Sequence, residues 1–313
     1  MESQIARFIF ESWGSIGKDG TCPPFFPGPQ PISIERRHFA NFKHNKYLAC
    51  EKTDGIRMAL VCKEIDGIKH CVLVNRSMKM EYIKFKSISS NAYKGTILDG
   101  EIVKSKDGKM LFMVYDAVMV SGTCLKNSTL SDRLCAIGKF VKSIMKMKSD
   151  PFVIKLKTFY TIDDMKILID KVKNGNFDYK NDGLIFTPIA PGIKIGTHET
   201  MYKWKPKSMN TIDFRVKNRQ DGTIGLYIQN RGEYIFSSLL KPEHISQKWK
   251  MDLVDESIAE CKFLDTEWPN RWEPVGIRTD KNYPNNTRTF NRTMVNIQED
   301  IQIHEFMSLK KQK

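Results

Sequence analysis

The chain has 313 residues, about twice the usual length of one domain, so we expect two domains with separate hydrophobic cores. Hydrophobic residues make up 41% and charged residues 27% of the chain, and the longest apolar stretches are strand-sized and interrupted by polar residues, which argues for a globular protein and against a membrane span. The formal charge of +14 favours a polyanionic partner such as nucleic acid, or else a solvated basic surface.

The N-terminal stretch MESQIARFIFESWG contains an apolar cluster together with acidic residues. It lacks the cationic start and the small-residue cleavage site of a secretory signal peptide, so we expect none. The seven cysteines are odd in number, widely spaced and without a CxxC pair. This usage favours reduced thiols in an intracellular protein and disfavours a zinc site.

From residue 47 to residue 120 the pattern predicts short β-strands punctuated by Asp-Gly pairs. Two of these pairs, at 66–67 and 107–108, are flanked by strand patterns on both sides and are therefore predicted hairpin turns. The strands that flank them are predicted at 57–62, 68–74, 96–103 and 110–120.

Two helices are predicted next. The first begins near Ser131, because apolar residues recur at spacings of three and four after it. The second follows Thr161, which is an N-cap candidate; acidic residues lie in its first turn and Gly175 terminates it. The apolar face of the first helix consists of Leu134, Ile137, Val141 and Ile144.

Strand patterns return at 183–187 and 200–205, and a Lys-Pro pair stops the second of them. Five more short strands then fall within about 80 residues, a pattern typical of a small barrel. An amphipathic helix is predicted near 299–309. The five strands are predicted at 211–216, 223–228, 233–237, 257–263 and 272–277.

The hexapeptide KTDGIR, which begins at Lys52 and follows the apolar strand YLAC, has the features of a nucleophilic amine in an exposed loop. Gly55 shapes the loop, and Arg57 is a nearby cation that can bind phosphate. Alternatively, the hexapeptide is only a charged turn. An ordinary lysine, with a pKa of about 10.4, is neutral in roughly one molecule in a thousand near pH 7.4, a handicap of about 4 kcal/mol that the surroundings must relieve.

Lys203 and Lys205 are candidates to relieve it. In the strand MYKWK, period-two geometry places both lysines on one face and Tyr202 and Trp204 on the other. Two ammonium groups in a half-buried site lower the pKa of a third lysine and hold an α-phosphate. The alternative is a polar strand face turned towards solvent.

Three further elements carry charges suited to phosphate chemistry. Asp99 and Glu101 share a strand face, and Asp182 begins another strand; such carboxylates hold Mg²⁺ or Mn²⁺, or orient a lysine. About 75 residues beyond the lysine strand, Arg278 and Lys281 in the segment RTDK are able to grip a triphosphate tail. Each element taken alone is also compatible with an ordinary turn.

Together, and in this order, the elements resemble the covalent nucleotidyltransferase superfamily of mRNA capping enzymes and ATP-dependent polynucleotide ligases. The capping branch is favoured, and within it the compact capping enzymes of large DNA viruses such as chlorella virus. Ligases commonly carry Glu-Gly where this chain has Asp182-Gly183. The resemblance runs from about Pro27 to the C-terminus, through PGPQPISIER, EKTDGIR, VYDAVMVSG, NDGLIFTP, MYKWKPKSMNTIDF and IRTDKNYPN.

The resemblance implies an α+β architecture. A nucleotidyltransferase domain of antiparallel sheets with flanking helices is expected at 1–208, and an OB-fold β-barrel at 209–313. The terminal helix, at about 298–311, is expected to pack back on the first domain.

The resemblance also implies roles for individual residues. These are Lys52 as the nucleophile; Arg57 and Glu101 at the ribose; Arg76 at phosphate or ribose; Tyr115, where the family often has Phe, stacked on guanine; Lys157 at the guanine O6; Asp182 near the metal; Lys203 and Lys205 at the α-phosphate; and Asp213, Arg278, Asp280 and Lys281 completing the closed reactive state.

The implied reaction transfers GMP from GTP through a covalent lysine adduct to the 5′-diphosphate end of an RNA, with Mg²⁺ or Mn²⁺. Because no methyltransferase signature is found, RNA triphosphatase and cap methyltransferase activities are expected in other proteins. We expect a monomer without membrane attachment, located in the host cytoplasm (a viral factory) or the nucleus. An ATP-dependent ligase and a non-catalytic RNA-binding OB protein are the alternatives.

Overall fold

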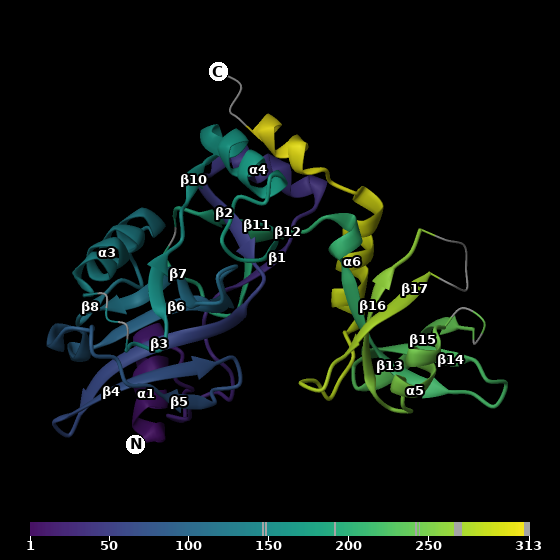
Figure 1. Ribbon diagram of the computed structural model, residues 1–313, viewed down its shortest axis with the longest axis horizontal. Coiled ribbons are helices and arrows are strands. Elements are labelled where there is room, and N and C mark those ends of the chain that lie inside the picture. Colours follow the sequence, from purple (N-terminus) through teal and green to yellow (C-terminus); the bar gives the residue numbers. More distant parts are fainter. Residues whose placement is uncertain are drawn as a thin grey trace. The chain divides into compact units, whose positions relative to one another are not determined.

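The computed structural model describes residues 1–309 except 146, 148, 191, 242, 244 and 266–270; residues 310–313 are not described. The chain forms two compact units. The first contains Met1–Ile32, His38–Trp204 and the terminal segment from His304, and the second contains Ser33–Arg37 and Lys205–Ile303. Each unit is therefore built from segments that are distant in the sequence (Figure 1).

The larger sheet of the first unit has seven strands in the order β5-β4-β3-β6-β7-β8, with β9 paired in parallel to β7. Both predicted Asp-Gly hairpins are confirmed. Asp66 and Gly67 have φ of 51° and 74°, the left-handed conformation that a two-residue hairpin turn requires. The strands are β3 (Ile56–Ile65), β4 (Ile68–Asn75), β5 (Met80–Tyr82), β6 (Thr96–Lys104), β7 (Met110–Val120), β8 (Thr123–Cys124) and β9 (Val153–Leu156).

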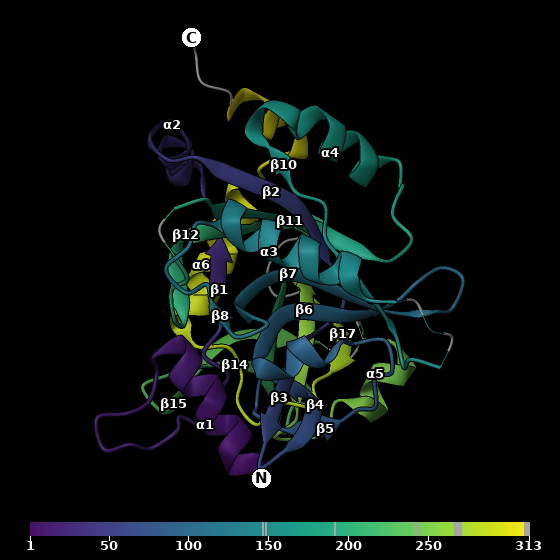
Figure 2. The ribbon, with the colours of Figure 1, turned by 90° about the vertical axis from the view of Figure 1, so that its left-hand side faces the viewer.

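Helices cover the two faces of this sheet (Figures 1 and 2). The predicted helix after residue 130 is confirmed as α3 (Leu130–Ser143), which buries Ile137 and Phe140 on one face. The other face is covered by α1 (Glu2–Trp13), a helix that was not predicted. Its buried residues Ile5, Ile9 and Trp13 recur every four positions, the spacing of one helical face.

The second sheet of the first unit has five strands in the order β1-β12-β11-β2-β10. One face carries a cluster of aromatic rings that includes Phe186 and Tyr202, and Phe306 of the terminal 3₁₀ helix packs 4.9 Å from Phe186. The short α2 (Asn41–His44) and the predicted second helix, α4 (Met165–Lys173), flank the sheet. The strands are β1 (Gln30–Ser33), β2 (Tyr47–Thr53), β10 (Tyr160–Thr161), β11 (Asn181–Pro188) and β12 (Thr197–Trp204).

The second unit contains an antiparallel sheet in the order β15-β14-β13-β16-β17, close to the five predicted strands. Phe214, Trp272 and Phe290 meet in its core. The expected closed barrel is not seen among the described residues, because β15 and β17 are the two edges of an open order. Apolar alternation identifies the inner face of each strand and leaves the pairing of the edges undetermined. The elements are β13 (Thr211–Asn218), β14 (Ile224–Asn230), β15 (Glu233–Leu240), α5 (Gln247–Asp252), β16 (Ile258–Phe263) and β17 (Trp272–Ile277).

The segment predicted as a terminal helix near 299–309 forms a 3₁₀ helix from Ile303, and an α-helix that was not predicted precedes it. The helix, α6, spans Thr287–Glu299, because the Asn286 side chain accepts a hydrogen bond from the Thr289 amide at 2.9 Å and Asp300 ends the helix with φ of 40°. Ile303–Leu309 is a 3₁₀ helix, and residues 310 and 311 of the predicted helix lie outside the described part. None of the described helices has the length and apolar character needed to cross a membrane.

Candidate active site

Strands β2 and β11 lie side by side (Figure 2), and Lys52 and Asp182 meet at their paired ends. Gly183 lies opposite Lys52, and a register shift between Asn181 and Gly183 makes a bulge at Asp182. Bulges of this kind redirect a side chain out of the regular pleat. The Lys52 Nζ lies 2.7 Å from the Asp182 Oδ1, with 21% and 10% of the two side chains exposed. The amine is therefore held by a carboxylate while it remains accessible to solvent.

Lys203 lies on the same sheet face as Lys52. It pairs with Ile185 across β11, and Ile185 pairs with Cys50, two residues before Lys52 on β2. Directly paired side chains lie on one face, as do residues two apart in a strand. The predicted alternation is thus confirmed for Lys203 against the buried Tyr202. Lys205 follows the end of β12 and belongs to the second unit, so its position relative to Lys52 is not described.

A buried ion pair between Arg57 and Asp99 lies close to Glu101. The Arg57 guanidinium donates to both Asp99 carboxylate oxygens at 3.0 and 2.5 Å, and the Tyr115 hydroxyl donates to the Asp99 Oδ1 at 2.7 Å. Burial alone would lower the pKa of Arg57, but the charge of Asp99 outweighs it and raises that pKa. The guanidinium also donates to the Pro29 carbonyl at 2.9 Å, so it is firmly oriented.

Lys157 lies near the same Tyr115 ring, and 2% of its side chain is exposed. Its Nζ donates to the Glu51 carbonyl at 3.0 Å and lies 3.6 Å from the Glu51 Oε1 and 3.8 Å from the Glu101 Oε2. Burial opposes the charge of Lys157, yet these carboxylates raise its pKa. The Tyr179 hydroxyl donates to the Glu51 Oε1 at 2.8 Å. The ammonium group of Lys157 also lies 5.8 Å from the centre of the Tyr115 ring.

Two carboxylate oxygens in this network are buried acceptors with no hydrogen-bond donor among the described residues: the Oε2 atoms of Glu51 and Glu101. Burial raises the pKa of Glu101 above its ordinary value, although Lys157 and Lys52 act in the opposite direction. Buried acceptors of this kind are costly unless a partner satisfies them. The Glu101 oxygen, on a side chain that is 19% exposed, is suited to receive a donor from a bound ligand, whereas the Glu51 side chain is enclosed.

In the second unit, four predicted residues meet at Asp213, which is 5% exposed. The Arg278 Nη1 lies 3.2 Å from the Asp213 Oδ1, and the Lys281 Nζ donates to the Asp213 Oδ2. Asp280 binds the other edge of the Arg278 guanidinium at 2.8 and 2.9 Å, and this hydrogen bonding lowers the pKa of Asp280 to about 2. The Asn285 side chain accepts from the Asp213 amide at 3.0 Å. Both cations are thus held at one buried carboxylate.

The structure therefore brings together six of the predicted residues in the first unit and four in the second. Arg76 makes no side-chain contact with either group among the described residues; it lies exposed in the turn after β4. Sequence reasoning missed Glu51, Tyr179 and Asn285. The position of Glu51 was a usable signal, because an acid beside Lys52 in a strand must face the opposite, buried side. The six residues are Lys52, Arg57, Glu101, Tyr115, Lys157 and Asp182.

The carboxylates can be tested against the needs of a divalent cation. No group of three or more His, Cys, Asp or Glu suited to a metal occurs in the described part of the chain. Asp182 and Glu101 both lie near Lys52 and offer the oxygen ligands that Mg²⁺ or Mn²⁺ prefers. Mg²⁺ is commonly held by one or two carboxylates together with substrate phosphates. The residues thus fit a cation shared with a substrate, rather than a closed protein cage.

Two family descriptions match the chain in succession. The mRNA capping enzyme catalytic domain matches residues 5–207, and the mRNA capping enzyme C-terminal domain matches residues 209–307. In fold, the chain is similar to a mycobacterial DNA ligase D complexed with ATP and MES, with a TM-score of 0.50 and 15% identity, covering 82% of this chain and 95% of that one. The fold is therefore shared with a protein outside the capping enzyme family.

Curated relatives carry the same family name. The mRNA-capping enzyme subunit alpha of Schizosaccharomyces pombe is 30% identical over 325 residues, which cover 90% of this chain and 79% of that protein. The mRNA-capping enzyme of Danio rerio is 30% identical over 295 residues, covering 88% of this chain and 46% of that protein. The chain thus spans most of the yeast relative and about half of the fish one. Since one domain match covers more than half of the sequence and a second follows it, this chain is a nucleotidyltransferase of the mRNA capping enzyme family.

Proposed function

We propose that the protein is an mRNA guanylyltransferase that carries GMP on Lys52 from GTP to the 5′-diphosphate end of an RNA. One observation carries the proposal. The Lys52 amine is accessible, is held 2.7 Å from Asp182, and lies close enough to Glu101 to influence its charge, while Glu101 neighbours Lys157 and Lys157 neighbours the Tyr115 ring. An amine poised in this way beside groups that suit a purine nucleotide is the requirement for covalent nucleotidyl transfer.

In the first step the Lys52 nitrogen attacks the α-phosphorus of GTP. A nitrogen–phosphorus bond forms, the bond from that phosphorus to the bridging oxygen breaks, and pyrophosphate leaves. The amine must lose its proton before it attacks, and the Asp182 carboxylate is the acceptor within hydrogen-bond reach. Lys203, on the same sheet face, is assigned to the α-phosphate, together with Lys205.

In the second step the terminal phosphate oxygen of the RNA attacks the same phosphorus. The nitrogen–phosphorus bond breaks, a 5′-5′ triphosphate bridge forms, and Lys52 recovers its proton. Because both steps are displacements at the same phosphorus, the protein acts mainly by positioning the reacting groups and stabilising phosphate charge.

Recognition of guanine is assigned to two side chains. Tyr115 offers an aromatic face for stacking, and Lys157 is assigned to the guanine O6. Adenine carries an amino group at the corresponding position. This group donates hydrogen bonds, so it cannot accept one from the Lys157 ammonium group. Glu51 and Tyr179 keep Lys157 in place as positioning residues. Arg57, Arg76 and Glu101 are assigned to the ribose and phosphates.

Along the chain, a nucleotidyltransferase domain is assigned to about residues 1–208 and an OB-fold domain to about 209–313. The segment from His304 belongs to the first unit, and the second unit contains most of the OB-fold domain. Its Arg278 and Lys281 are proposed to leave Asp213 and bind the pyrophosphate end of GTP in a closed state, with Asp280 orienting the guanidinium. The partial exposure of the two cations, 27% and 34% of the side chains, supports this exchange.

Mg²⁺ or Mn²⁺ would be held by Asp182, with Glu101 as the nearest second carboxylate. The ion would supply positive charge to the transferring phosphates. RNA triphosphatase and cap methyltransferase activities are assigned to other proteins, and the protein is proposed to act as a monomer. Its seven free cysteines support an intracellular location, in the cytoplasm or the nucleus.

Incubation with α-labelled GTP and Mg²⁺ or Mn²⁺ tests the proposal. We expect a protein label that resists denaturation and is lost in Lys52→Ala, while Lys139→Ala, an exposed lysine on α3, keeps it. Labelling by ATP instead of GTP would identify a ligase, to which the fold likeness also points. RNA binding with no adduct from either nucleotide would leave only a non-catalytic module.

A further inference from the structure

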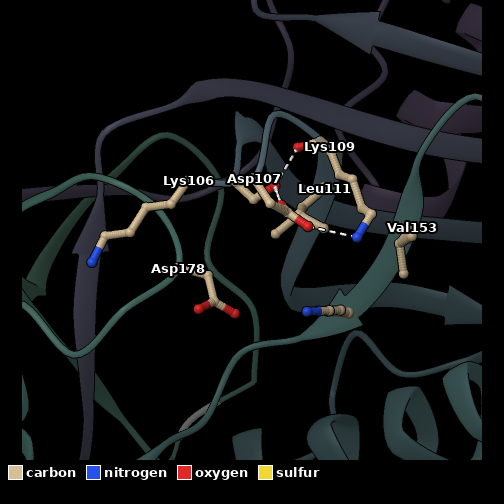
Figure 3. Close-up of a pocket in the computed structure, with 8 residues that line it drawn as sticks. Lys106, Asp107, Lys109, Leu111, Val153 and Asp178 are labelled. Atoms are coloured by element: carbon tan, nitrogen blue, oxygen red, sulfur yellow. Dashed lines mark hydrogen bonds and ion pairs between the residues drawn. The ribbon is translucent and has the colours of Figure 1, made fainter.

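A pocket of about 500 Å³ lies apart from the residues assigned to GTP. It is formed where the turn between β6 and β7 meets β9 and the segment before β11 (Figure 3). Its floor is apolar and its rim carries charged groups. The lining residues are Ser105, Lys106, Asp107, Lys109, Leu111, Val153, Lys155 and Asp178.

The pocket lies on the same sheet face as Glu101, which is assigned to the nucleotide. Leu111 pairs with Val103 on β6, and Glu101 lies two residues before Val103, so Leu111 and Glu101 share a face turned away from the core under α3. Val153 pairs with Leu111 on β9, and Lys155 follows it towards Lys157. At about 3.3 Å per residue, the backbone of Leu111 lies roughly 13 Å along β7 from that of Tyr115. One continuous sheet face therefore leads from the residues assigned to the nucleotide to the pocket.

The segment leading to Asp182 provides a second link. Asp178 lines the pocket, Tyr179 binds Glu51, and Asp182 binds Lys52. A ligand in the pocket and a nucleotide at Lys52 would thus contact the two ends of one five-residue segment.

The free charge at the rim is positive. Asp107 is neutralised by Lys109 at 2.5 Å and also accepts from Ser105, so neither Asp107 nor Lys109 contributes a net charge. Lys106 donates to the uncharged Gly175 carbonyl at 2.9 Å and keeps its charge. Lys155 is exposed and makes no ion pair with any described residue. Figure 3 shows Lys106 and Lys109 extending in opposite directions from the turn, with Asp178 as the remaining acid.

The basic character extends beyond the lining. The turn has the sequence KSKDGK, and the segment on the other side of the pocket has the sequence KVKNGNFDYK. Acidic and basic residues nearly balance in the second unit from residue 205 to residue 303, so the positive excess of the chain belongs to the first unit. Clustered lysines on a face that leads to the catalytic lysine favour a phosphodiester chain as the occupant.

We propose that this pocket binds the nucleotides of the acceptor RNA that follow its 5′ end, with Lys106 and Lys155 contacting the phosphates. The inference rests on the proposed function, since it concerns the RNA of the second step. Stacked nucleotides advance about 3.4 Å each, so a span of about 13 Å corresponds to about four nucleotides. Leu111 and Val153 provide the apolar floor against which a sugar and base can rest.

The test separates the two half-reactions. The variant Lys106→Ala/Lys155→Ala and the control Lys139→Ala are first loaded with labelled GMP, which we expect to proceed equally in both because no RNA takes part. The loaded proteins are then mixed with a diphosphate-ended dinucleotide or a ten-nucleotide RNA. For the longer RNA we expect the KM to rise about two- to fivefold per lysine removed, as for the loss of one exposed charge pair. The dinucleotide is too short to reach the pocket and should react unchanged.

Salt dependence provides an independent readout. For the longer RNA, the slope of log Kd against log salt should fall by about 0.7 for each phosphate contact removed. Equal KM values for the variant and the control with the ten-nucleotide RNA would overturn the inference and leave guanylyltransferase activity intact. If the unsubstituted protein takes no label from GTP, the proposed function fails, and the inference fails with it.

Discussion

The network around Lys157 in the first unit and the cluster around Asp213 in the second hold their charges in opposite ways. Lys157 and the Glu51 side chain are almost fully enclosed, and a hydroxyl group and a backbone carbonyl complete the arrangement. Arg278 and Lys281 share one carboxylate and remain about one-third exposed. The enclosed network suits a fixed recognition surface, whereas the exposed cations are suited to exchange one anion for another.

The largest expected effect concerns stability. Asp99→Asn leaves the buried Arg57 guanidinium without its counter-charge, so we expect the free energy of unfolding to fall by about 3–5 kcal/mol. Asp280→Asn breaks an exposed pair and should cost less than about 1 kcal/mol. Urea denaturation of both variants measures the difference. Equal losses of unfolding free energy in the two variants would show that enclosure does not set the strength of these ion pairs.

Arg278→Ala should affect activity far more than it affects stability. If the guanidinium stabilises the departing pyrophosphate, its removal slows lysyl-GMP formation by about 100-fold. The midpoint of urea unfolding should change little, because Lys281 and Asn285 still hold Asp213. Single-turnover labelling with GTP gives the rate. A normal first step with slow transfer to RNA would contradict the assigned role.

Glu51→Gln tests the enclosed network without removing a contact to substrate. Loss of the charge that steadies Lys157 should raise the KM for GTP about tenfold, the effect of about 1.4 kcal/mol. Tyr179→Phe, which deletes only one hydroxyl, should have a smaller effect of the same kind. The decisive measurement is the ratio of labelling by GTP to labelling by ATP. A variant that is merely less stable would keep that ratio.

The smallest expected effect is a dependence on pH. The folded-state pKa of Glu101 is raised by burial, so the folded protein holds this proton more tightly than the unfolded chain does. Stability is therefore lost as pH rises from the unfolded-state pKa through the folded-state pKa. Glu101→Gln should gain stability relative to the unsubstituted protein as the pH rises above the ordinary pKa of a glutamate. Urea midpoints that run parallel over this range would contradict the prediction.

Local features were predicted well. The hairpin at Asp66-Gly67 was found because the turn demands residues that tolerate positive φ, and its strands alternate regularly. Helix α1 was missed although Ile5, Ile9 and Trp13 recur at helical spacing, because the segment was considered only as a possible leader. Helix α6 was missed, since the Asn286 cap and the left-handed Asp300 were not recognised.

The pairing of Lys52 with Asp182 illustrates a different limit. The two residues are 130 positions apart, and the family resemblance, rather than any local pattern, associated them. The roles assigned to the individual residues at this site remain predictions that the substitutions above will test.

The amino-acid sequence by itself determined the longer strands, which side chains share a face of them, and that Lys52 follows an apolar strand into an Asp-Gly turn. These properties depend on neighbours a few residues away. The short strands β1, β5, β8, β9 and β10 were not predicted. Only the tertiary structure decided that Glu51, Tyr179 and Lys157 meet, that Asp213 gathers Arg278 and Lys281, and that the described strands of the second unit form an open order. Contacts between distant segments depend on how sheets pair and pack, and an alternating pattern is compatible with more than one such pairing.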